Sequence, residues 1–273
     1  MYGNLIGLFL KQDLKLRNLT MDLQNTSSPQ PVQILSFPEH ALIKQDHLAL
    51  FAQADLLRLI IQLLSLPSIE TQTMLEEGIT DLQELLQYSN LPESDRLAEV
   101  FQQVRLQAKT LGLETWIEEY HRLFEGSVAC PINESGFIRR DKGVILSDIV
   151  GFYRAFGFSI SRKTGEKADH LIGELEFIVI LLVMLATAPG AEETRITHET
   201  LSAFSFDHLS EWLPAFCGCL TQTTVLPIYQ LSAQLLQSTW SGIMATNHLP
   251  RPERDMGALE EDGTPYECDI ADD

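Results

Sequence analysis

The stretch that decides the fold is ADHLIGELEFIVILLVMLATA, which runs from Ala168 to Ala188. Every residue from Phe177 to Ala186 is apolar, so a helix formed here has no polar face in its second half. Such a helix lies either at the centre of a domain or in a membrane. Because a membrane-spanning helix needs about 20 apolar residues, this run is too short to cross a bilayer. The sequence therefore predicts a buried central helix around which other helices pack.

Polar and titratable residues gather at the start of this predicted helix. Asp169 is placed to cap it, because its carboxylate can accept from the free backbone N–H groups of the first turn. His170 and Glu174 are four residues apart, so they lie on one helix face and can pair. The loop 159–168 leads directly into them, and we therefore expect an exposed helix start. These groups are either a cap with a satisfied pair or part of a functional site.

The composition limits the possible partners. The chain of 273 residues is long enough for one large domain or two small ones. It carries 19 Lys and Arg against 38 Asp and Glu, which gives a net charge of −19. An acidic surface repels phosphate backbones and attracts basic peptides or proteins, so nucleic-acid binding is disfavoured. A solvated surface that only keeps the protein soluble is the other interpretation.

Known catalytic and metal-binding motifs do not occur in the sequence. GxSxG, HExxH, phosphate-loop and Rossmann glycine patterns are all absent. The four cysteines form neither zinc-type pairs nor a dense disulfide framework, and Cys217 and Cys219 are better explained as buried thiols of a cytosolic protein. Asp169, His170 and Glu174 could still form a metal-dependent hydrolytic site, which remains an alternative function.

Apolar residues recur at the helical period over most of the chain, and no segment alternates at period two. The sequence thus predicts an all-α protein without a β-sheet. The expected helical segments are 47–67, 68–92 (interrupted), 94–112, 113–126, 144–156, 168–188, 201–223 and 225–245.

Several positions carry sharper expectations. Ser94 is a plausible cap for the helix that follows it. The stretch 189–200 reads as a loop or short turn. In the helix after it, Pro214 implies a kink or a break. The residues of that helix expected to point inward are Phe206, Leu209, Trp212 and Leu213.

The chain is predicted to hold one helical domain at 46–250, between an N-terminal extension at 1–45 and a tail at 251–273. Much of the extension is rich in Ser, Pro, Gln and Asn, so we expect partial disorder. The tail has nine acidic and two basic residues and is expected to be disordered. The first 18 residues lack the charge pattern of a secretory signal or a membrane anchor, and translation from Met21 is an alternative.

Five short motifs occur in a fixed order along the chain. They are YHRLF at 120–124, CPINES at 130–135, FYRAFG at 152–157, DHLIGELEF at 169–177, and the His, Trp-Leu-Pro and Tyr positions within 208–229. Together they resemble the TorD/DmsD family of redox-enzyme maturation chaperones, to which the NarJ group is related. The resemblance covers roughly residues 48–245. It departs from the family pattern in two ways, because Ala168 stands where a proline often precedes Asp-His and both termini are longer than usual.

The resemblance implies a single-domain helical bundle around a buried central helix, and a cytoplasmic chaperone that is not an enzyme and needs no cofactor. Its partners would be the catalytic subunit of a molybdopterin-dependent oxidoreductase and the twin-arginine signal peptide of that subunit. It would hold this client back from export until the cofactor is inserted, as a monomer or homodimer, without binding nucleic acid or inserting into a membrane.

An acidic protein suits such a peptide, because carboxylates accept paired guanidinium donors and a helical groove can take an apolar stretch. For Tyr120 and Phe124 a core role is favoured, since they continue an aromatic stripe at spacings of four. The peptide-binding residues implied by the resemblance are Asp169, His170, Glu174, Tyr120, Phe124 and Glu134.

Overall fold

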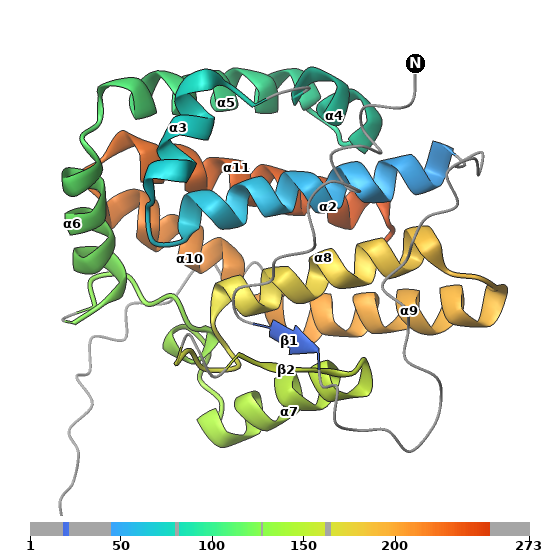
Figure 1. The fold of residues 1–273 in the computed structure, drawn as a ribbon. Coiled ribbons are helices and arrows are strands. Elements are labelled where there is room, and N and C mark those ends of the chain that lie inside the picture. The colour runs from blue at the N-terminus through green and yellow to red at the C-terminus, as the bar shows by residue number, and fades with distance from the viewer. Residues whose placement is uncertain (1–18, 22–44, 80–81, 127, 162–164, 252–273) are drawn as a thin grey trace, which may run out of the picture.

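A computed structural model shows a helical protein (Figure 1) and describes residues 19–21, 45–79, 82–126, 128–161 and 165–251. The helices are α2 (Gln45–Leu64), α3 (Ile69–Glu77), α4 (Leu82–Ser89), α5 (Ser94–Thr110), α6 (Leu113–Phe124), α7 (Lys142–Ala155), α8 (Leu171–Thr187), α9 (Ala191–Phe204), α10 (Ser210–Thr223) and α11 (Pro227–Thr246). A 3-10 turn, η1 (Glu134–Gly136), and a π-helical turn, η2 (Ser205–Leu209), interrupt the series. The predicted all-α class is confirmed.

The central helix α8 is buried along nearly its whole length. Its residues from Leu171 to Leu182 are all buried, and they include Glu174 and Glu176. Helices α2 and α9 pack along it, and Figure 1 shows α8 between these two. The apolar stretch therefore has the buried central place that its composition predicted.

Helix α2 is the other long apolar element of the core. Its stretch His47–Leu64 is long and apolar enough to cross a membrane, but 61% of that stretch is buried inside the fold. The helix packs against α8, α4 and α11. Its buried Gln53 donates to the carbonyl of Ser89 at 2.9 Å, which ties α2 to the end of α4.

The stretch 189–200 was predicted to be a loop, and this prediction is wrong, because α9 occupies it. Arg195 pairs with Glu192 and Glu199, so polar contacts one turn apart support the exposed side of the helix. Only the second half of α9 carries a buried apolar stripe, with Leu201 and Phe204 fully buried. Such a helix offers little apolar periodicity at its start, and the sequence pattern missed it for this reason.

The π-helical turn η2 changes which residues face the core. Phe206 was expected to point inward but is 44% exposed, whereas Leu209, Trp212 and Leu213 are buried as predicted. A π turn has an extra residue per turn, so it rotates the side chains that follow it relative to an ideal α-helix. The break in α-helical bonding lies at η2, one turn before Pro214, and α10 continues through the proline.

The predicted cap of α5 is also corrected. Glu93 holds the cap position with a left-handed φ of +62°, and its side chain makes no capping bond. The hydroxyl of Ser94 instead donates to the carbonyl of Leu91 at 2.8 Å. The hydroxyl therefore stabilises the preceding turn and leaves the N–H groups of α5 uncapped by this residue.

A two-stranded antiparallel sheet departs from the prediction that the chain lacks a sheet. Strand β1 (Leu19–Met21) pairs with β2 (Phe158–Ile160), and β1 also contacts α8. Strands of three residues cannot show the alternation by which a sequence reveals a strand. The rest of the predicted N-terminal extension and the acidic tail after Arg251 lie outside the described residues.

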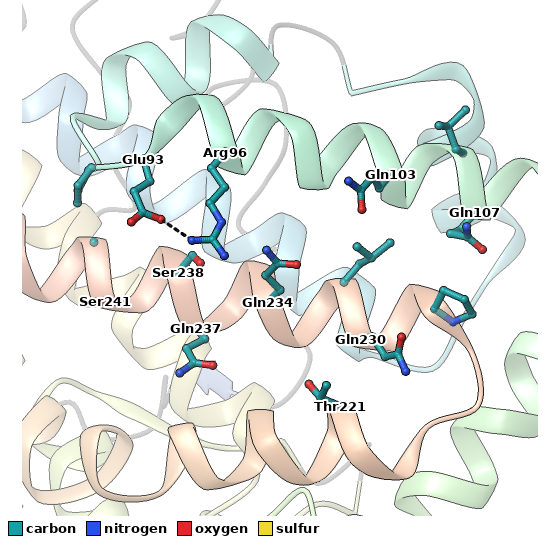
Figure 2. A pocket seen from close by; sticks show the side chains of 15 residues that line it. Glu93, Arg96, Gln103, Gln107, Thr221, Gln230, Gln234, Gln237, Ser238 and Ser241 are labelled. Atoms are coloured by element: carbon teal, nitrogen blue, oxygen red, sulfur yellow. Dashed lines mark hydrogen bonds and ion pairs between the residues drawn. The ribbon is translucent and has the colours of Figure 1, made fainter. Parts of the chain in front are cut away.

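A groove of about 830 Å³ lies between α5 and α11 (Figure 2). Its walls are largely uncharged, and an ion pair between Glu93 and Arg96, 3.3 Å apart, stands at one end. The glutamines that line it are Gln103, Gln107, Gln230, Gln234 and Gln237. None of the six residues predicted to bind a peptide lines this groove, so it lies apart from the candidate site.

Candidate functional site

Backbone hydrogen bonds join the start of α8 to the loop that precedes α7. The N–H of Leu171 donates to the carbonyl of Ile132 at 3.0 Å, and the N–H of Glu134 donates to the carbonyl of Asp169 at 2.9 Å. Asn133 and His170 form an isolated antiparallel bridge between these two bonds. Segments more than thirty residues apart in sequence are thus held as neighbours, and side chains from both build the site.

Asp169 is fully buried and holds this loop in place. Its two carboxylate oxygens accept from the side-chain amide of Asn133 and from the backbone N–H of Ser135, each at 3.1 Å. The predicted capping role of Asp169 is therefore wrong. His170 is the cap of α8, and its Nδ1 accepts from the N–H of Ile172 at 3.2 Å. The carboxylate turns to the loop because the loop presents N–H groups that would otherwise be buried without partners.

His170 is 4% exposed, so the helix start is not the exposed feature that the sequence suggested. Its predicted pair with Glu174 does not form, and its Nε2 instead lies 3.5 Å from a carboxylate oxygen of Glu166. Burial lowers the pKa of His170 to about 4, although the nearby Asp169 opposes this shift. The imidazole is therefore neutral at neutral pH, and because Nδ1 accepts, its proton lies on Nε2 toward Glu166.

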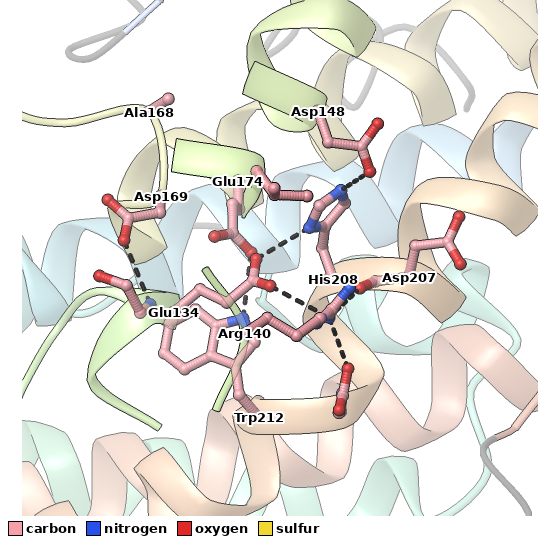
Figure 3. Close-up of polar contacts among 12 residues, drawn as sticks. Glu134, Arg140, Asp148, Ala168, Asp169, Glu174, Asp207, His208 and Trp212 are labelled. Carbon is pink, nitrogen blue, oxygen red and sulfur yellow. Dashed lines mark hydrogen bonds and ion pairs between the residues drawn. The ribbon is translucent and has the colours of Figure 1, made fainter. Parts of the chain in front are cut away.

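Glu134 and His208 form a fully buried pair beside this helix start (Figure 3). The Nδ1 atom of His208 lies 2.9 Å from the carboxylate of Glu134. Arg140 reaches the same carboxylate at 3.5 Å, and it also contacts Glu211 at 2.6 Å and the backbone carbonyl of Asp207 at 2.9 Å. The pair thus fastens the loop to η2, and the half-exposed Arg140 adds a link to Glu211 of α10.

Glu174 is fully buried, and one of its two oxygens has no partner among the described residues. The other oxygen accepts from the indole N–H of Trp212 at 3.2 Å. Burial raises the pKa of Glu174 well above its usual value, and the negative charge of Glu134 adds to the effect. Both causes favour the neutral acid, whereas the hydrogen bond from Trp212 favours the carboxylate.

Tyr120 and Phe124 lie in the aromatic core, as the favoured interpretation of their spacing predicted. They are 8% and 7% exposed, and their rings contact each other edge to face with centroids 5.1 Å apart. The ring centroid of Phe124 also lies 6.4 Å from that of Phe216 in α10, and the centroid of Phe216 lies 5.9 Å from that of Trp212. This chain of rings connects α6 to the residue that binds Glu174, so the six predicted residues form two neighbouring groups.

Several residues of the site were not predicted. Arg140, Asp148 and Glu211 are charged residues on its exposed side, and the Nε2 atom of His208 lies 3.4 Å from Asp148. Two sequence signals pointed to this region. His208 and Trp212 are four residues apart, and Arg140 is one of 19 basic residues in a chain that has 38 acidic ones. Neither signal could reveal the partners, which come from distant segments.

Comparison with known proteins identifies the family of this chain. The nitrate reductase delta subunit family matches residues 70–218, which is more than half of the chain. The chain belongs to this family. The resemblance to redox-enzyme maturation chaperones that the motifs indicated is thereby confirmed.

Two similar proteins of this group carry chaperone names. A chlorate reductase assembly chaperone from Ideonella dechloratans is 32% identical over 121 residues, which are 42% of this chain and 63% of the relative. The chaperone TorD from Vibrio cholerae is 28% identical over 81 residues, or 30% of this chain and 37% of the relative. The chain thus spans less than two thirds of either relative.

One solved structure was also matched to this chain. It is a redox enzyme maturation protein from Archaeoglobus fulgidus, with 19% sequence identity and a TM-score of 0.36. The alignment covers 77% of this chain and 98% of that protein.

The metal-binding alternative for this delta-subunit family member finds no support in the donor geometry. Asp169 binds the loop, His170 caps α8 and Glu174 binds Trp212, so the three side chains point to different partners. Among the residues that the structure describes, no group of three or more His, Cys, Asp or Glu side chains is arranged to hold a metal ion. The three residues therefore do not converge on one metal position, as that alternative required.

The predicted buried thiols are confirmed in part. Cys217 is buried, and burial raises its pKa to about 12, so the reactive thiolate is scarce at neutral pH. Cys130 is buried as well, and burial likewise raises its pKa, with the neighbouring Cys219 adding to the shift. Cys219 is only half-buried.

Proposed function

We propose that this protein is a maturation chaperone for a molybdenum-containing oxidoreductase. In this role it binds the twin-arginine signal peptide or the apoprotein of its client in the cytoplasm, and it prevents export before the cofactor is inserted. The observation that carries the proposal is the family match over residues 70–218, together with the chaperone names of the similar proteins. The protein itself performs no reaction in this role and needs no cofactor.

The peptide-binding site of this proposal is the rim of carboxylates around the start of α8. The side chains of Asp148, Glu166 and Glu211 are 54%, 40% and 30% exposed. Each lies within ion-pair distance of a more deeply placed residue, namely His208, His170 and Arg140. Exposed carboxylates whose positions are fixed from below can accept the forked N–H groups of an arginine in a defined geometry.

The buried residues act through this rim in the proposal. Asp169, His170, Glu134 and Glu174 hold the loop, η2 and the helix start together, and they therefore determine where the rim carboxylates stand. Tyr120 and Phe124 shape the hydrophobic wall beside them. We accordingly expect direct contact with the arginines from the rim, and a positioning role for the six residues predicted from the sequence.

The test is a calorimetric titration with a synthetic twin-arginine signal peptide. Glu166→Gln and Asp148→Asn should each weaken binding about tenfold, because each removes one charge-assisted contact with a guanidinium. The matched control is Glu99→Gln, which removes an exposed carboxylate of α5 and should leave the affinity unchanged.

A second peptide with the two arginines replaced by lysines separates charge from geometry. It should bind more weakly, because an ammonium group cannot form the two parallel hydrogen bonds of a guanidinium. Equal affinity for both peptides, or equal affinity of all three protein variants, would contradict the proposed site. Absence of any binding to the wild-type chain would contradict signal-peptide recognition itself.

A further inference from the structure

The strand β1 occupies a specific place beside the central helix. It pairs antiparallel with β2, and Leu19 lies opposite Ile160 in the register. The side chain of Leu19 is 2% exposed and belongs to the hydrophobic core. Its backbone N–H donates to a carboxylate oxygen of Glu176 at 3.0 Å, across 157 residues of sequence. A segment far from the helical domain in sequence thus enters its core.

Glu176 gives this place the chemistry of a peptide-binding site. The side chain is only 3% exposed, and it lies on the helix that is otherwise the most apolar in the protein. A buried carboxylate that loses a hydrogen-bond donor is destabilised, because water does not replace that donor. Any segment that replaces β1 must therefore bring its own donor, and a backbone N–H in an extended chain supplies one.

The edge of β2 supplies the second half of the site. The strand follows α7 after Gly157, whose φ of +78° turns the chain out of the helix. Within the described ranges, β1 is its sole strand partner. An unpaired strand edge readily takes up another chain, and a pairing of three residues is marginal by itself. The edge therefore needs an occupant, but the pairing holds that occupant weakly.

The sequence around β1 places basic residues before an apolar one. Lys15 and Arg17 precede the buried Leu19, and a twin-arginine signal peptide likewise carries its basic residues before its apolar stretch. Both would be attracted to a chain with a net charge of −19. In sequence, Glu166 of the proposed rim follows Ile160, the last residue of β2, by six positions.

We propose that the edge of β2 and the carboxylate of Glu176 form a binding site for an extended, apolar peptide strand, and that β1 fills this site in the free protein. A segment of the client polypeptide takes the place of β1 by adding to the same edge. The contacts of β1 support the binding site itself, whereas the exchange with a client rests on the proposed function. The N-terminal segment then competes with the client for the edge of β2, and it reduces the binding of other extended chains to the free protein.

The binding site can be tested without any client. A variant that lacks residues 1–21 is titrated with a fluorescent synthetic peptide that corresponds to residues 12–25 of this chain. The peptide should bind the truncated variant, and it should bind the full chain at least about tenfold more weakly, because the tethered β1 competes at high effective concentration.

Altered peptides serve as matched controls. Leu19→Ile keeps an apolar side chain of the same volume and should bind nearly as well as the original peptide. Leu19→Asp should bind at least about tenfold more weakly, because the buried position cannot take a charge. A peptide with N-methylated Leu19 keeps the side chain and loses only the donor to Glu176, so it should also bind more weakly.

Three results would overturn the proposed binding site. A truncated variant that does not melt cooperatively would show that β1 is a required part of the core and not the occupant of an open site. A folded truncated variant that does not bind the peptide would equally contradict it. Equal binding of all four peptides would show that the peptide binds without the register of β1 and without the hydrogen bond from Leu19 to Glu176.

Competition then tests the exchange and separates it from the proposed function. A twin-arginine signal peptide should displace the fluorescent peptide from the truncated variant, and it should bind this variant more tightly than the full chain. If it binds by direct titration but displaces nothing, the exchange is wrong and the chaperone function stands. If it does not bind at all, the proposed function fails, while binding of the chain's own peptide still supports the strand site.

Discussion

Glu174 is a carboxyl group in surroundings that favour its neutral form. Burial and the charge of Glu134 raise its pKa above the usual 4.5, so the folded state holds the proton more tightly than the unfolded state does. The resulting stabilisation is complete at low pH and is lost as the pH rises above the usual value toward the folded-state pKa. Glu174→Gln cannot ionise and keeps an acceptor for Trp212.

We therefore expect Glu174→Gln to become progressively more stable than the wild type as the pH rises. The difference in the free energy of unfolding should grow by up to about 1.4 kcal/mol per pH unit. Urea unfolding of both proteins between about pH 5 and about pH 8 measures it. The exposed Glu99→Gln variant provides a flat reference, and an equally flat curve for Glu174→Gln would show that Glu174 is charged in the folded protein.

Asp169 should matter more for stability than a capping residue would. Loss of an N-cap costs about 1 kcal/mol, but Asp169→Ala also strands the N–H of Ser135 and the amide of Asn133. We expect a loss of about 2–4 kcal/mol for Asp169→Ala, the scale of two hydrogen bonds to a buried charge. Asp169→Asn keeps one acceptor and should lose about half of this, and chemical denaturation distinguishes the two. A loss near 1 kcal/mol in Asp169→Ala would restore the capping interpretation.

Sequence reasoning selected the residues at the centre of the candidate site but not the contacts that they make. Asp169, His170 and Glu174 stand out because ionisable groups at the start of an apolar helix need a reason to be there. Their partners could not be predicted, because Ser135 and Trp212 approach from distant segments and each contact depends on how those segments pack. The sequence pattern assumed neighbours along one helix, so it paired His170 with Glu174 and assigned the cap to Asp169.

At the scale of elements, the π-helical turn η2 decides which side chains face the core between α9 and α10. A matched pair of substitutions tests this rotation, because Phe204 is fully buried and Phe206 is 44% exposed. Phe204→Ala should destabilise the protein by about 3–5 kcal/mol, the usual cost of removing a buried phenyl ring. Phe206→Ala should cost less than about 1 kcal/mol. Thermal or urea unfolding of both variants suffices, and a similar loss for Phe206→Ala would mean that Phe206 packs inward, in α-helical phase with Leu209 and Leu213.

The elements that were predicted from sequence show clear apolar periodicity, and the elements that were missed do not. The long apolar helices α2 and α8 were predicted from sequence, because their buried faces dominate their composition. Helix α9 was missed, since Arg195 with its two glutamates makes its first half as polar as a loop. The π turn was missed because one extra residue leaves no compositional trace. Strand β1 could not be predicted, since its pairing with β2 depends on contacts more than 130 residues away in sequence.

The arrangement of the whole molecule follows from one physical requirement. A helix that is apolar on every side must be covered on every side, so α2, α9 and the β1–β2 pair all take their places against α8. The same requirement buries the polar start of that helix, where Asp169 binds the loop, His170 caps α8 and Glu174 accepts from Trp212 of α10. What remains accessible is an acidic rim on an acidic protein.

The net charge of −19 should therefore govern how fast an arginine-containing peptide arrives. Complementary charge speeds association, and salt screens it over a length of about 10 Å at 0.1 M ionic strength. Between about 0.05 M and about 0.5 M NaCl the association rate of a twin-arginine signal peptide should fall about tenfold, while the dissociation rate changes much less. Stopped-flow fluorescence with a labelled peptide separates the two rates. A peptide with both arginines replaced by glutamine should show a shallower dependence on salt, because it carries less of the attracted charge. An association rate that does not change with salt would mean that the acidic surface serves solubility alone, and that the rim does not attract the peptide before contact.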